Sequence, residues 1–517
     1  MGKRVFILGI DGAELDLILQ WVREGKLPYF QRVLQKGVHG KMKSTMPPIT
    51  PCAWPSLFTG KNPGKHGQFD FFTLDEKKEL RLQVTEYRTE KTLWRILSDH
   101  GKRCCIVNVP FTYPPEPVNG ILISGFMTPD TKSQFTYPDE FKEEILTAFP
   151  DFRVAENVQY SPLKPDQEAY LTEIKTLTRL QGEVAMYCYR KEPWDFFMVA
   201  FMGVDHVQHH YWKYMDSSHP GYIQSSQFQD AIYSVYCELD RLLGRFLTMI
   251  SDETIFLIVS DHGFGTYEKD VNINRMLKEK GYLKLKKSLP VFMKSILLSL
   301  GIDPGRIITV LLRTGLIGLS KKHPEKRRGK ILDRLSFNWK DVDWKRTKAY
   351  SFGYYGMVYL TNQDATRELN QAIADDLLQL REGKTPVVDE LFFKENIYHG
   401  AKLKICPDII FPMRNFSYAA SNVFLFPSKS LFSSPKTFQS GGHRLGATFI
   451  GYSRGMADGH RIEDVEIIDV TPTVLSLLEI IPPDDMDGNS LGLLCRQGFD
   501  PRQNIQEEDG RQEPSCG

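Results

Sequence analysis

Short runs of apolar residues alternate along the chain with longer segments in which apolar residues recur every three or four positions. Five runs have the length and composition of buried strands: Val5–Ile10, Cys104–Val109, Phe196–Phe201, Thr254–Ser260 and Ala447–Tyr452. Helical periodicity lies between them, for example in Leu27–Gln35, Lys91–His100 and Tyr222–Ile250. Strands separated by helices predict parallel strands joined by crossovers. We therefore expect an α/β fold with a mostly parallel central sheet flanked by helices.

Residues 271–400 differ from the rest of the chain. Helical patterns dominate there, and residues 284–330 contain 12 Lys and Arg residues but only two Asp and Glu residues. We interpret 271–400 as an inserted helical cap within a discontinuous α/β core of residues 1–270 and 401–495. The polar segment 496–517 has no periodicity and is predicted to be disordered.

Overall charge and cysteine content narrow the function classes. The chain has 65 Lys and Arg residues against 64 Asp and Glu residues, a net charge of +1, which argues against specific nucleic-acid binding. No apolar stretch reaches 18 residues, so we expect no spanning helix. The eight cysteines contain no C-x-x-C pair. We expect reduced thiols in a cytoplasmic protein rather than a disulfide framework or a cysteine zinc site.

Acidic and histidine side chains follow several predicted strands or lie in glycine-rich turns. In α/β sheets ligands bind outside the carboxyl ends of the strands. Together these side chains offer the ligand chemistry of Zn²⁺ and similar divalent metals. The set is Asp11, Asp205, His209, Asp261, His262 and His443. Each also has a structural explanation, since Asp is a common helix N-cap and His a common turn residue.

The spacing within this set carries further information. Asp205 and His209 are four residues apart, so one helical turn would place both on one side. His206 and His210 flank this pair, and we expect them to be structural. Asp261 and His262 are adjacent, close a predicted strand and precede a glycine. Neighbouring residues point to different sides, so this pair could serve two metals, or one metal and a bridge.

Thr50-Pro51 is predicted to begin a helix, because Pro is favoured in the first helical turn. A helix N-terminus favours an anion. A threonine hydroxyl there, next to a divalent cation, can become a nucleophile. The alternative at this point is that Thr50 is only the N-cap of the helix.

Several motifs occur together in one order: GIDGAELD, ITPCAW, TGKNPGKHG, DHVQHH, SDHGFG, GGHR and DVTPTVLSLLEIIPPDDMDGNSL. In this respect the sequence resembles the alkaline phosphatase superfamily, in particular its type I phosphodiesterase/nucleotide pyrophosphatase branch. The resemblance spans nearly the whole chain.

The resemblance implies two metal ions, zinc or alternatively manganese, bridged by the phosphoryl group of the substrate. It implies a first metal held by Asp205, His209 and His443. It implies a second metal held by Asp11, Thr50, Asp261 and His262, with Thr50 as the nucleophile.

We therefore expect a two-metal phosphoryl-transfer hydrolase that acts on a small phosphate ester through a phosphothreonine intermediate. A phosphodiester is the first choice of substrate and a phosphomonoester the second. The alternatives are a phosphotransferase or mutase that uses the same site, and an inactive metal-binding relative.

The basic insert adds a separate hypothesis. Met293, Ile296, Leu297 and Leu300 share one helical face, and a second such face is predicted over 308–316, before the basic run 321–330. One possibility is that these helices form a lid packed on the core, with their charges solvated. The other is that residues 284–330 make a peripheral contact with an anionic membrane or steer an anionic substrate.

Overall fold

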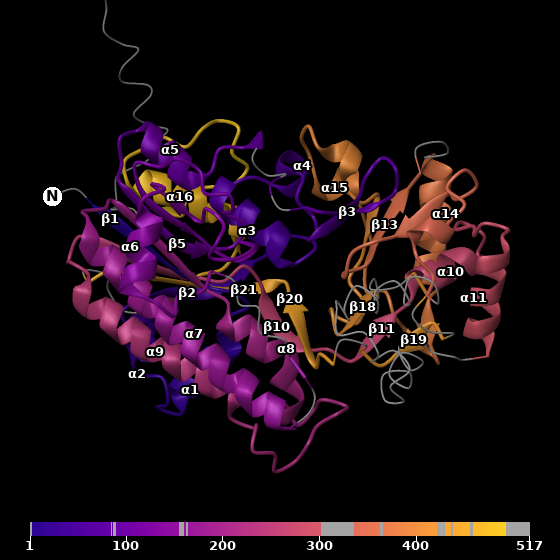
Figure 1. The fold of residues 1–517 in the computed structure, drawn as a ribbon, viewed down its shortest axis with the longest axis horizontal. Helices are drawn as coiled ribbons and strands as arrows, with labels where there is room; N and C mark the ends of the chain where they lie inside the picture. The colour runs from indigo at the N-terminus through magenta and orange to yellow at the C-terminus, as the bar shows by residue number, and fades with distance from the viewer. Residues whose placement is uncertain are drawn as a thin grey trace, which may run out of the picture.

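The structure, a computed structural model, describes residues 3–83, 85, 89–154, 160–161, 164–300, 336–361, 366–420, 425–426, 430–435, 438–454 and 459–492. Its centre is a ten-stranded sheet with helices on both faces (Figure 1). The strands of this sheet are β1 (Arg4–Ile10), β2 (Gly37–Lys43), β5 (Cys104–Val109), β6 (Gly120–Ser124), β7 (Thr136–Tyr137), β8 (Phe196–Phe201), β9 (Thr254–Val259), β21 (Gly446–Tyr452), β22 (His460–Arg461) and β23 (Val465–Glu466).

The sheet is mixed and mostly parallel. Its order is β22-β2-β21-β9-β1-β8-β5-β6-β7, with β23 also paired to β2. The central strands β9, β1, β8, β5 and β6 are parallel, as the sequence predicts. The expectation of a parallel strand was wrong for β21, which runs antiparallel to both β9 and β2. The segment that precedes β21 lies at the carboxyl edge of the sheet, so β21 starts at that edge and runs antiparallel to its neighbours. In the part of the chain that the structure describes, no crossover helix carries it to the opposite edge first.

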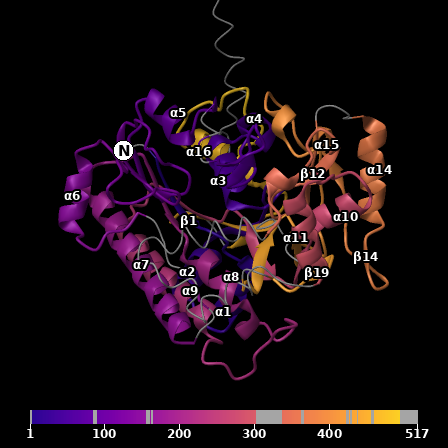
Figure 2. The ribbon, with the colours of Figure 1, turned by 45° about the vertical axis from the view of Figure 1, so that its right-hand side comes forward.

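Two helical layers bury the two faces of the sheet. One layer contains α1 (Leu15–Arg23), α2 (Pro28–Gln35), α6 (Phe141–Ala148), α7 (Lys164–Lys191), α8 (Gly203–Met215) and α9 (Ala231–Met249). The other contains α3 (Thr50–Thr59), α5 (Leu93–Asp99) and α16 (Val470–Leu477). Figure 2 shows α7 and α9 side by side on the face opposite α3, α5 and α16. Strand β1 explains this division, because Val5 and Ile7 face one layer while Phe6, Leu8 and Ile10 face the other.

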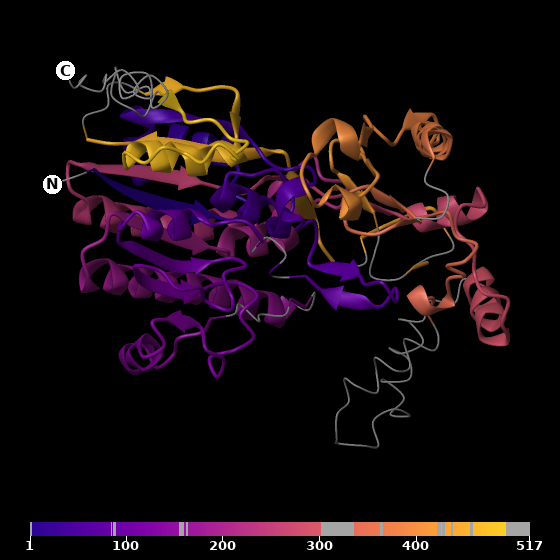
Figure 3. The same cartoon turned by 90° about the horizontal axis from the view of Figure 1, so that it is seen from above.

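A second lobe lies beside the sheet, with its own hydrophobic cluster (Figure 3). Its helices are α10 (Ile273–Glu279), α11 (Leu289–Ser299), α14 (Arg367–Leu378) and α15 (Lys394–Ile397), with the 3₁₀ turns η2 (Trp339–Asp341) and η3 (Leu403–Ile405). Its strands are β11 (Lys269–Val271), β12 (Ala349–Ser351), β13 (Met357–Leu360), β14 (Arg381–Glu382), β15 (Thr385–Pro386), β16 (Phe392–Phe393), β17 (Ile409–Ile410), β18 (Tyr418–Ala420) and β19 (Phe432–Ser433).

This lobe corrects the expectation of a purely helical cap. It contains a four-stranded sheet in the order β12-β13-β17-β16 and a three-stranded sheet in the order β18-β11-β19. Strands of two to four residues are too short to show a periodic pattern in the sequence. Because β17 and β18 pair with strands of the insert, the lobe extends beyond the expected boundary at residue 400.

The remaining elements connect the two lobes. They are α4 (Pro63–His66), the hairpin β3 (Phe72–Leu74) and β4 (Leu80–Leu82), and the pair β10 (Gly263–Thr266) and β20 (Gly441–Arg444). The 3₁₀ turn η4 (Ile467–Asp469) instead packs with α3 and α16 beside the central sheet. A hydrophobic cluster that includes Phe69, Tyr267, Tyr355 and Phe416 packs where the lobes meet. It holds the insert against the carboxyl edge of the central sheet.

The observed strand and helix bounds, the cysteines and the terminal segment can be compared with the predictions from the sequence. All five predicted strands match within one residue at each end, and Cys104–Val109 and Phe196–Phe201 match at both ends. The helix predicted over Tyr222–Ile250 begins only at Ala231. The six described cysteines are free, whereas Cys495 and Cys516 lie outside the described residues. The whole tail 496–517 and all of 301–335 also lie outside them. Among the described residues, no helix combines the length and the apolar character that crossing a membrane requires.

Candidate active site

The carboxyl ends of three neighbouring strands position most of the predicted site residues. Asp11 follows β1, Asp261 and His262 follow β9, and α8 begins directly after β8. Since β9, β1 and β8 are adjacent and parallel, their carboxyl ends meet at one edge of the sheet. His443 comes from β20, which pairs with β10 just after His262. The fold thus gathers residues that are up to 432 positions apart, from Asp11 to His443.

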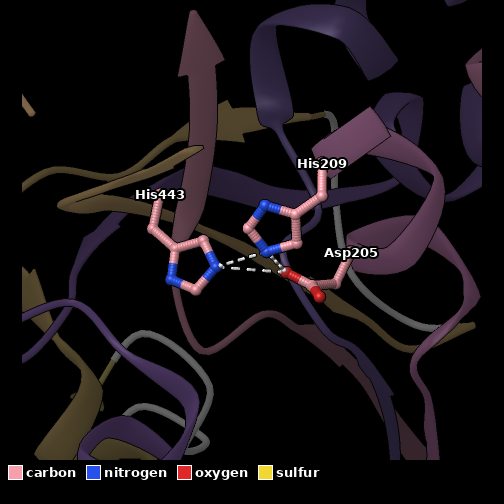
Figure 4. A group of neighbouring side chains, drawn as sticks. All are labelled: Asp205, His209 and His443. Atoms are coloured by element: carbon pink, nitrogen blue, oxygen red, sulfur yellow. Dashed lines mark hydrogen bonds and ion pairs between the residues drawn. The ribbon is translucent and has the colours of Figure 1, made fainter. Parts of the chain in front are cut away.

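The first group consists of Asp205, His209 and His443 (Figure 4). Oδ1 of Asp205 lies 3.3 Å from Nε2 of His209 and 3.3 Å from Nε2 of His443. The two Nε2 atoms are 3.1 Å apart. Both Asp205 and His209 lie on α8, and the predicted one-turn spacing brings them to the same side of that helix.

The second group lies next to the first and consists of Asp11, Asp205 and His262. Nε2 of His262 is 3.5 Å from Oδ1 of Asp11 and 3.3 Å from Oδ2 of Asp261. The rings of His262 and His443 stack with their centroids 3.5 Å apart, which joins the two groups. The six predicted Asp and His residues therefore form one cluster.

The backbone fixes how the three histidines present their nitrogens. Nδ1 of His209 faces the carbonyl oxygen of Gly441 at 3.0 Å, and Nδ1 of His443 faces that of Pro48 at 2.9 Å. Nδ1 of His262 faces the carbonyl of Gly263 at 3.2 Å. A carbonyl only accepts hydrogen bonds, so each Nδ1 carries the proton and each Nε2 presents a lone pair to the cluster. Metal-ligating histidines have this arrangement.

The acidic side chains of the cluster are also positioned by the surrounding chain. Gly12 N donates to Oδ1 of Asp261 at 3.1 Å, and Trp54 Nε1 donates to Oδ2 of Asp11 at 2.8 Å. Oδ1 of Asp205 and Oδ2 of Asp261 are buried, and no hydrogen-bond donor satisfies either of them within the described part of the chain. Buried carboxylate oxygens without donors are costly unless a cation compensates them.

The electrostatics agree with a binding site for cations. Burial lowers the pKa of His262 well below its ordinary value, and it lowers the pKa of His443 as well. Both imidazoles are therefore neutral near pH 7. Burial raises the pKa of Asp261 well above its ordinary value, against the effect of the Gly12 N–H. The residues present fit divalent metal ions, because they combine neutral imidazoles with buried carboxylates.

Thr50 lies beside the second group. It is the first residue of α3, whose N-cap is Ile49, and no side chain caps this helix. The alternative that Thr50 is the N-cap is therefore wrong. Its hydroxyl instead lies 3.4 Å from Nε2 of His262, in a position where Thr50 is only 4% exposed. The threonine hydroxyl thus faces the cluster at the N-terminal end of a helix.

A cavity of about 1070 Å³ opens from the first group, between the two lobes. His209 and His443 are part of its lining. Aromatic side chains from both lobes make up much of its wall: Phe71, Phe72, Phe337, Trp339, Phe352 and Phe416. The cavity is large enough for a drug-sized ligand.

Sequence reasoning missed the residues that orient the cluster. Trp54 holds Asp11, and Tyr355 of the insert accepts a hydrogen bond on its hydroxyl oxygen from His443 N at 3.0 Å. Position alone could have drawn attention to Trp54, because it lies one helical turn after Thr50. His206 and His210 are not in either group, and His210 instead stacks on Tyr160 with ring centroids 3.8 Å apart.

The chain is similar to known proteins both in its sequence and in its fold. Residues 5–411 match the family model described as type I phosphodiesterase/nucleotide pyrophosphatase. A search of curated protein sequences finds no significant match.

Solved structures show the same fold. Murine ectonucleotide pyrophosphatase/phosphodiesterase 5 matches with a TM-score of 0.51 and 12% identity, over 98% of this chain and 99% of that one. Phosphonoacetate hydrolase from Sinorhizobium meliloti, in complex with phosphonoformate, matches with a TM-score of 0.53 and 13% identity, over 92% and 96% of the two chains. At these identities the likeness concerns the fold alone.

Proposed function

Because the chain belongs to the type I phosphodiesterase/nucleotide pyrophosphatase family, we propose that it hydrolyses a small phosphodiester, with Thr50 as the nucleophile. The observation that carries this proposal is the cluster itself. Three imidazole lone pairs and three buried carboxylates meet within reach of a threonine hydroxyl. This combination of side chains can support phosphoryl transfer, whereas it has no evident role in stabilising the fold.

Metal ions are part of the proposal. Asp205, His209 and His443 would hold one divalent ion, and Asp11, Asp261 and His262 would hold the other together with Thr50. Zinc is the preferred ion, with manganese as the alternative. Bound there, the ions would neutralise phosphoryl charge and lower the pKa of the neighbouring hydroxyl.

The residues of the chain then have separate roles in the reaction. Thr50 Oγ1 attacks phosphorus in line with the departing oxygen and forms a phosphothreonine, which water hydrolyses in a second step. The N-terminal end of α3 favours the negative charge of the phosphoryl group. Trp54 and the backbone carbonyls of Pro48 and Gly441 keep the ligands oriented.

Two cations of the site motifs, Arg444 and Lys65, are held by other partners, which favours a diester monoanion over a monoester dianion. The guanidinium of Arg444 donates to backbone carbonyls, including that of Phe416, and Lys65 pairs with Asp487. Neither cation is therefore directed at the cluster. The aromatic cavity also gives room for a second ester group. An ester of a nucleotide phosphate is one diester of this class. An inactive threonine-to-alanine form of murine ectonucleotide pyrophosphatase/phosphodiesterase 5 has been solved in complex with AMP, the kind of monoester that cleavage of such a diester releases.

The test is hydrolysis of bis-(p-nitrophenyl) phosphate and p-nitrophenyl phosphate by the full chain with added Zn²⁺ or Mn²⁺. We expect a higher kcat/KM for the diester. The reverse preference would favour the monoesterase alternative, and steady turnover without an added alcohol would argue against a phosphotransferase. A protein that binds metal but cleaves no ester in a broader screen would be the inactive relative.

A second proposal, peripheral contact with an anionic membrane, is favoured by α11. The apolar face predicted from the sequence is mostly exposed: Met293 is 51% exposed, Ile296 37% and Leu300 66%. Leu289 and Phe292, on the same helix, are also exposed, at 73% and 61%. Lys286 and Lys287, which are exposed as well, precede the same helix. An apolar face next to lysines is complementary to an anionic lipid surface. The second predicted helix and the run 321–330 lie outside the described residues. A cytoplasmic location, for which the free thiols argue, belongs to this proposal.

Co-sedimentation with phosphatidylserine-containing vesicles tests the membrane contact. We expect salt-sensitive binding that the double change Leu289→Ser and Phe292→Ser abolishes. Leu378→Ser is the control, because Leu378 is an exposed apolar residue on α14. Absence of binding at low salt would contradict the proposal.

A further inference from the structure

The insert contributes one polar group to the cluster, the hydroxyl of Tyr355. This residue lies in the loop between β12 and β13 and is 7% exposed. It lines the cavity together with His209 and His443. Its ring centroid lies 5.6 Å from that of His443. Tyr355 is thus the point at which the second lobe meets the metal-ligand groups.

The loop holds Tyr355 firmly. Gly353 and Gly356 have φ values of +97° and +40°, which residues other than glycine rarely adopt. Phe411 N donates to the carbonyl of Gly356 at 2.9 Å, and Ala420 N donates to the carbonyl of Tyr354 at 2.7 Å. The tyrosine side chain is therefore carried on a loop that is anchored on both sides of it.

The hydrogen bonding of the Tyr355 hydroxyl is incomplete. Its oxygen accepts from His443 N at 3.0 Å. A hydroxyl also has one hydrogen to donate, and within the described residues no hydrogen bond uses it. A nearly buried donor on the wall of a cavity is available to a ligand in that cavity.

Position indicates which atom of the substrate would accept this hydrogen bond. In-line displacement places the attacking and departing oxygens on opposite sides of phosphorus. Thr50 lies by His262 and does not line the cavity, whereas Tyr355 lies by His443 and does. The departing group therefore leaves on the side of Tyr355.

We propose that Tyr355 donates a hydrogen bond to the leaving-group oxygen of the phosphodiester, while its own oxygen holds the His443 backbone. This rests on the proposed hydrolase function. The bond from phosphorus to the ester oxygen breaks with both electrons going to oxygen, and the Tyr355 hydrogen bond stabilises the negative charge that develops there. No proton needs to be transferred for this effect.

The experiment compares wild type with Tyr355→Phe on two diesters, bis-(p-nitrophenyl) phosphate and phenyl p-nitrophenyl phosphate, the second assayed for release of phenol. Phenolate is the poorer leaving group and gains more from the hydrogen bond. We expect a roughly tenfold or greater loss of kcat/KM for phenol release and a loss of less than about threefold for bis-(p-nitrophenyl) phosphate. Tyr359→Phe is the control, because it removes a half-buried insert hydroxyl outside the cavity.

Two equilibrium measurements separate this role from a purely structural one. Metal content should be unchanged in Tyr355→Phe. By calorimetry, orthovanadate, whose apical oxygen mimics the departing oxygen, should bind roughly tenfold more weakly to this variant. Equal losses on both reactions, unchanged vanadate affinity or a loss of bound metal would each overturn the inference. Wild-type enzyme that cleaves neither diester would instead count against the proposed function.

Discussion

The hydroxyl of Thr50 lies 3.4 Å from Nε2 of His262, although the two residues are 212 positions apart in the sequence. Thr50 does not cap its helix, so its side chain has no helix-stabilising hydrogen bond to lose. The contact exists because α3 begins where β9 ends. It places a hydroxyl where the proposed mechanism requires a nucleophile.

Thr50→Ala should abolish phosphodiester hydrolysis, with kcat reduced by on the order of 10³ or more. The fold and the metal content should be largely retained, with unfolding free energy within about 1 kcal/mol of wild type. Thr50→Ser should keep part of the activity. Thr59→Ala, at the other end of α3, is the matched control and should remain active. An alanine variant with near wild-type turnover would contradict the assignment.

Metal content should depend on which group is changed. Reconstituted wild type should bind close to two zinc equivalents, and His209→Ala should bind close to one, because His209 belongs only to the first group. Asp205→Ala should lose at least one and affect both groups, since its carboxylate lies within both. His210→Ala, a neighbour outside the groups, should keep two. Elemental analysis after dialysis makes the measurement, and a wild type free of metal under zinc excess would contradict the metal site.

Trp54→Phe should weaken zinc binding without removing a ligand. The indole N–H donates to Oδ2 of Asp11 at 2.8 Å, and loss of such an orienting partner typically costs 10- to 100-fold in metal affinity. A competition titration with a chelator would measure this. Trp94→Phe also removes a buried indole, one that hydrogen bonds to Glu116 away from the cluster, and should leave zinc affinity unchanged. Equal effects of both changes would show that only packing had been lost.

The central strands could be predicted well because of where they lie. Strands such as β5 and β8 are buried on both faces, so their sequences are uninterrupted apolar runs with clear ends. The spacing of Asp205 and His209 was equally informative, because a helix fixes the relation between residues four apart. The direction of β21 could not be predicted, since it depends on the path of the chain through the insert.

The residues that support the site left no such signal. Trp54 reaches Asp11 across 43 positions, and Tyr355 reaches His443 across 88. Each contact is created by tertiary packing, and neither residue type is distinctive at its position. The two-residue strands of the insert were missed for a related reason, because their pairing is set by neighbours and not by local pattern.

Asp70 should make the stability of the protein depend on pH. It lies just before β3, is 4% exposed, and burial raises its pKa to about 7. Because the folded pKa lies above the ordinary value of 3.8, the folded state retains a proton that the unfolded chain has lost between about pH 4 and pH 7. The free energy of unfolding should therefore fall as the pH rises through this window and become level above it.

Asp70→Asn should remove this dependence, because an amide stays neutral and its oxygen can still accept the hydrogen bond that Phe71 N donates to Oδ1 at 2.6 Å. Relative to this variant, wild type should lose about 3 kcal/mol of unfolding free energy between pH 4.5 and pH 8. Urea unfolding of both proteins across that range, followed by circular dichroism, makes the comparison. The difference between the two curves isolates Asp70, since every other titrating group is common to both. Curves that stay parallel over the whole range would show that the Asp70 carboxyl is ionised in the folded protein at the same pH as in the unfolded chain.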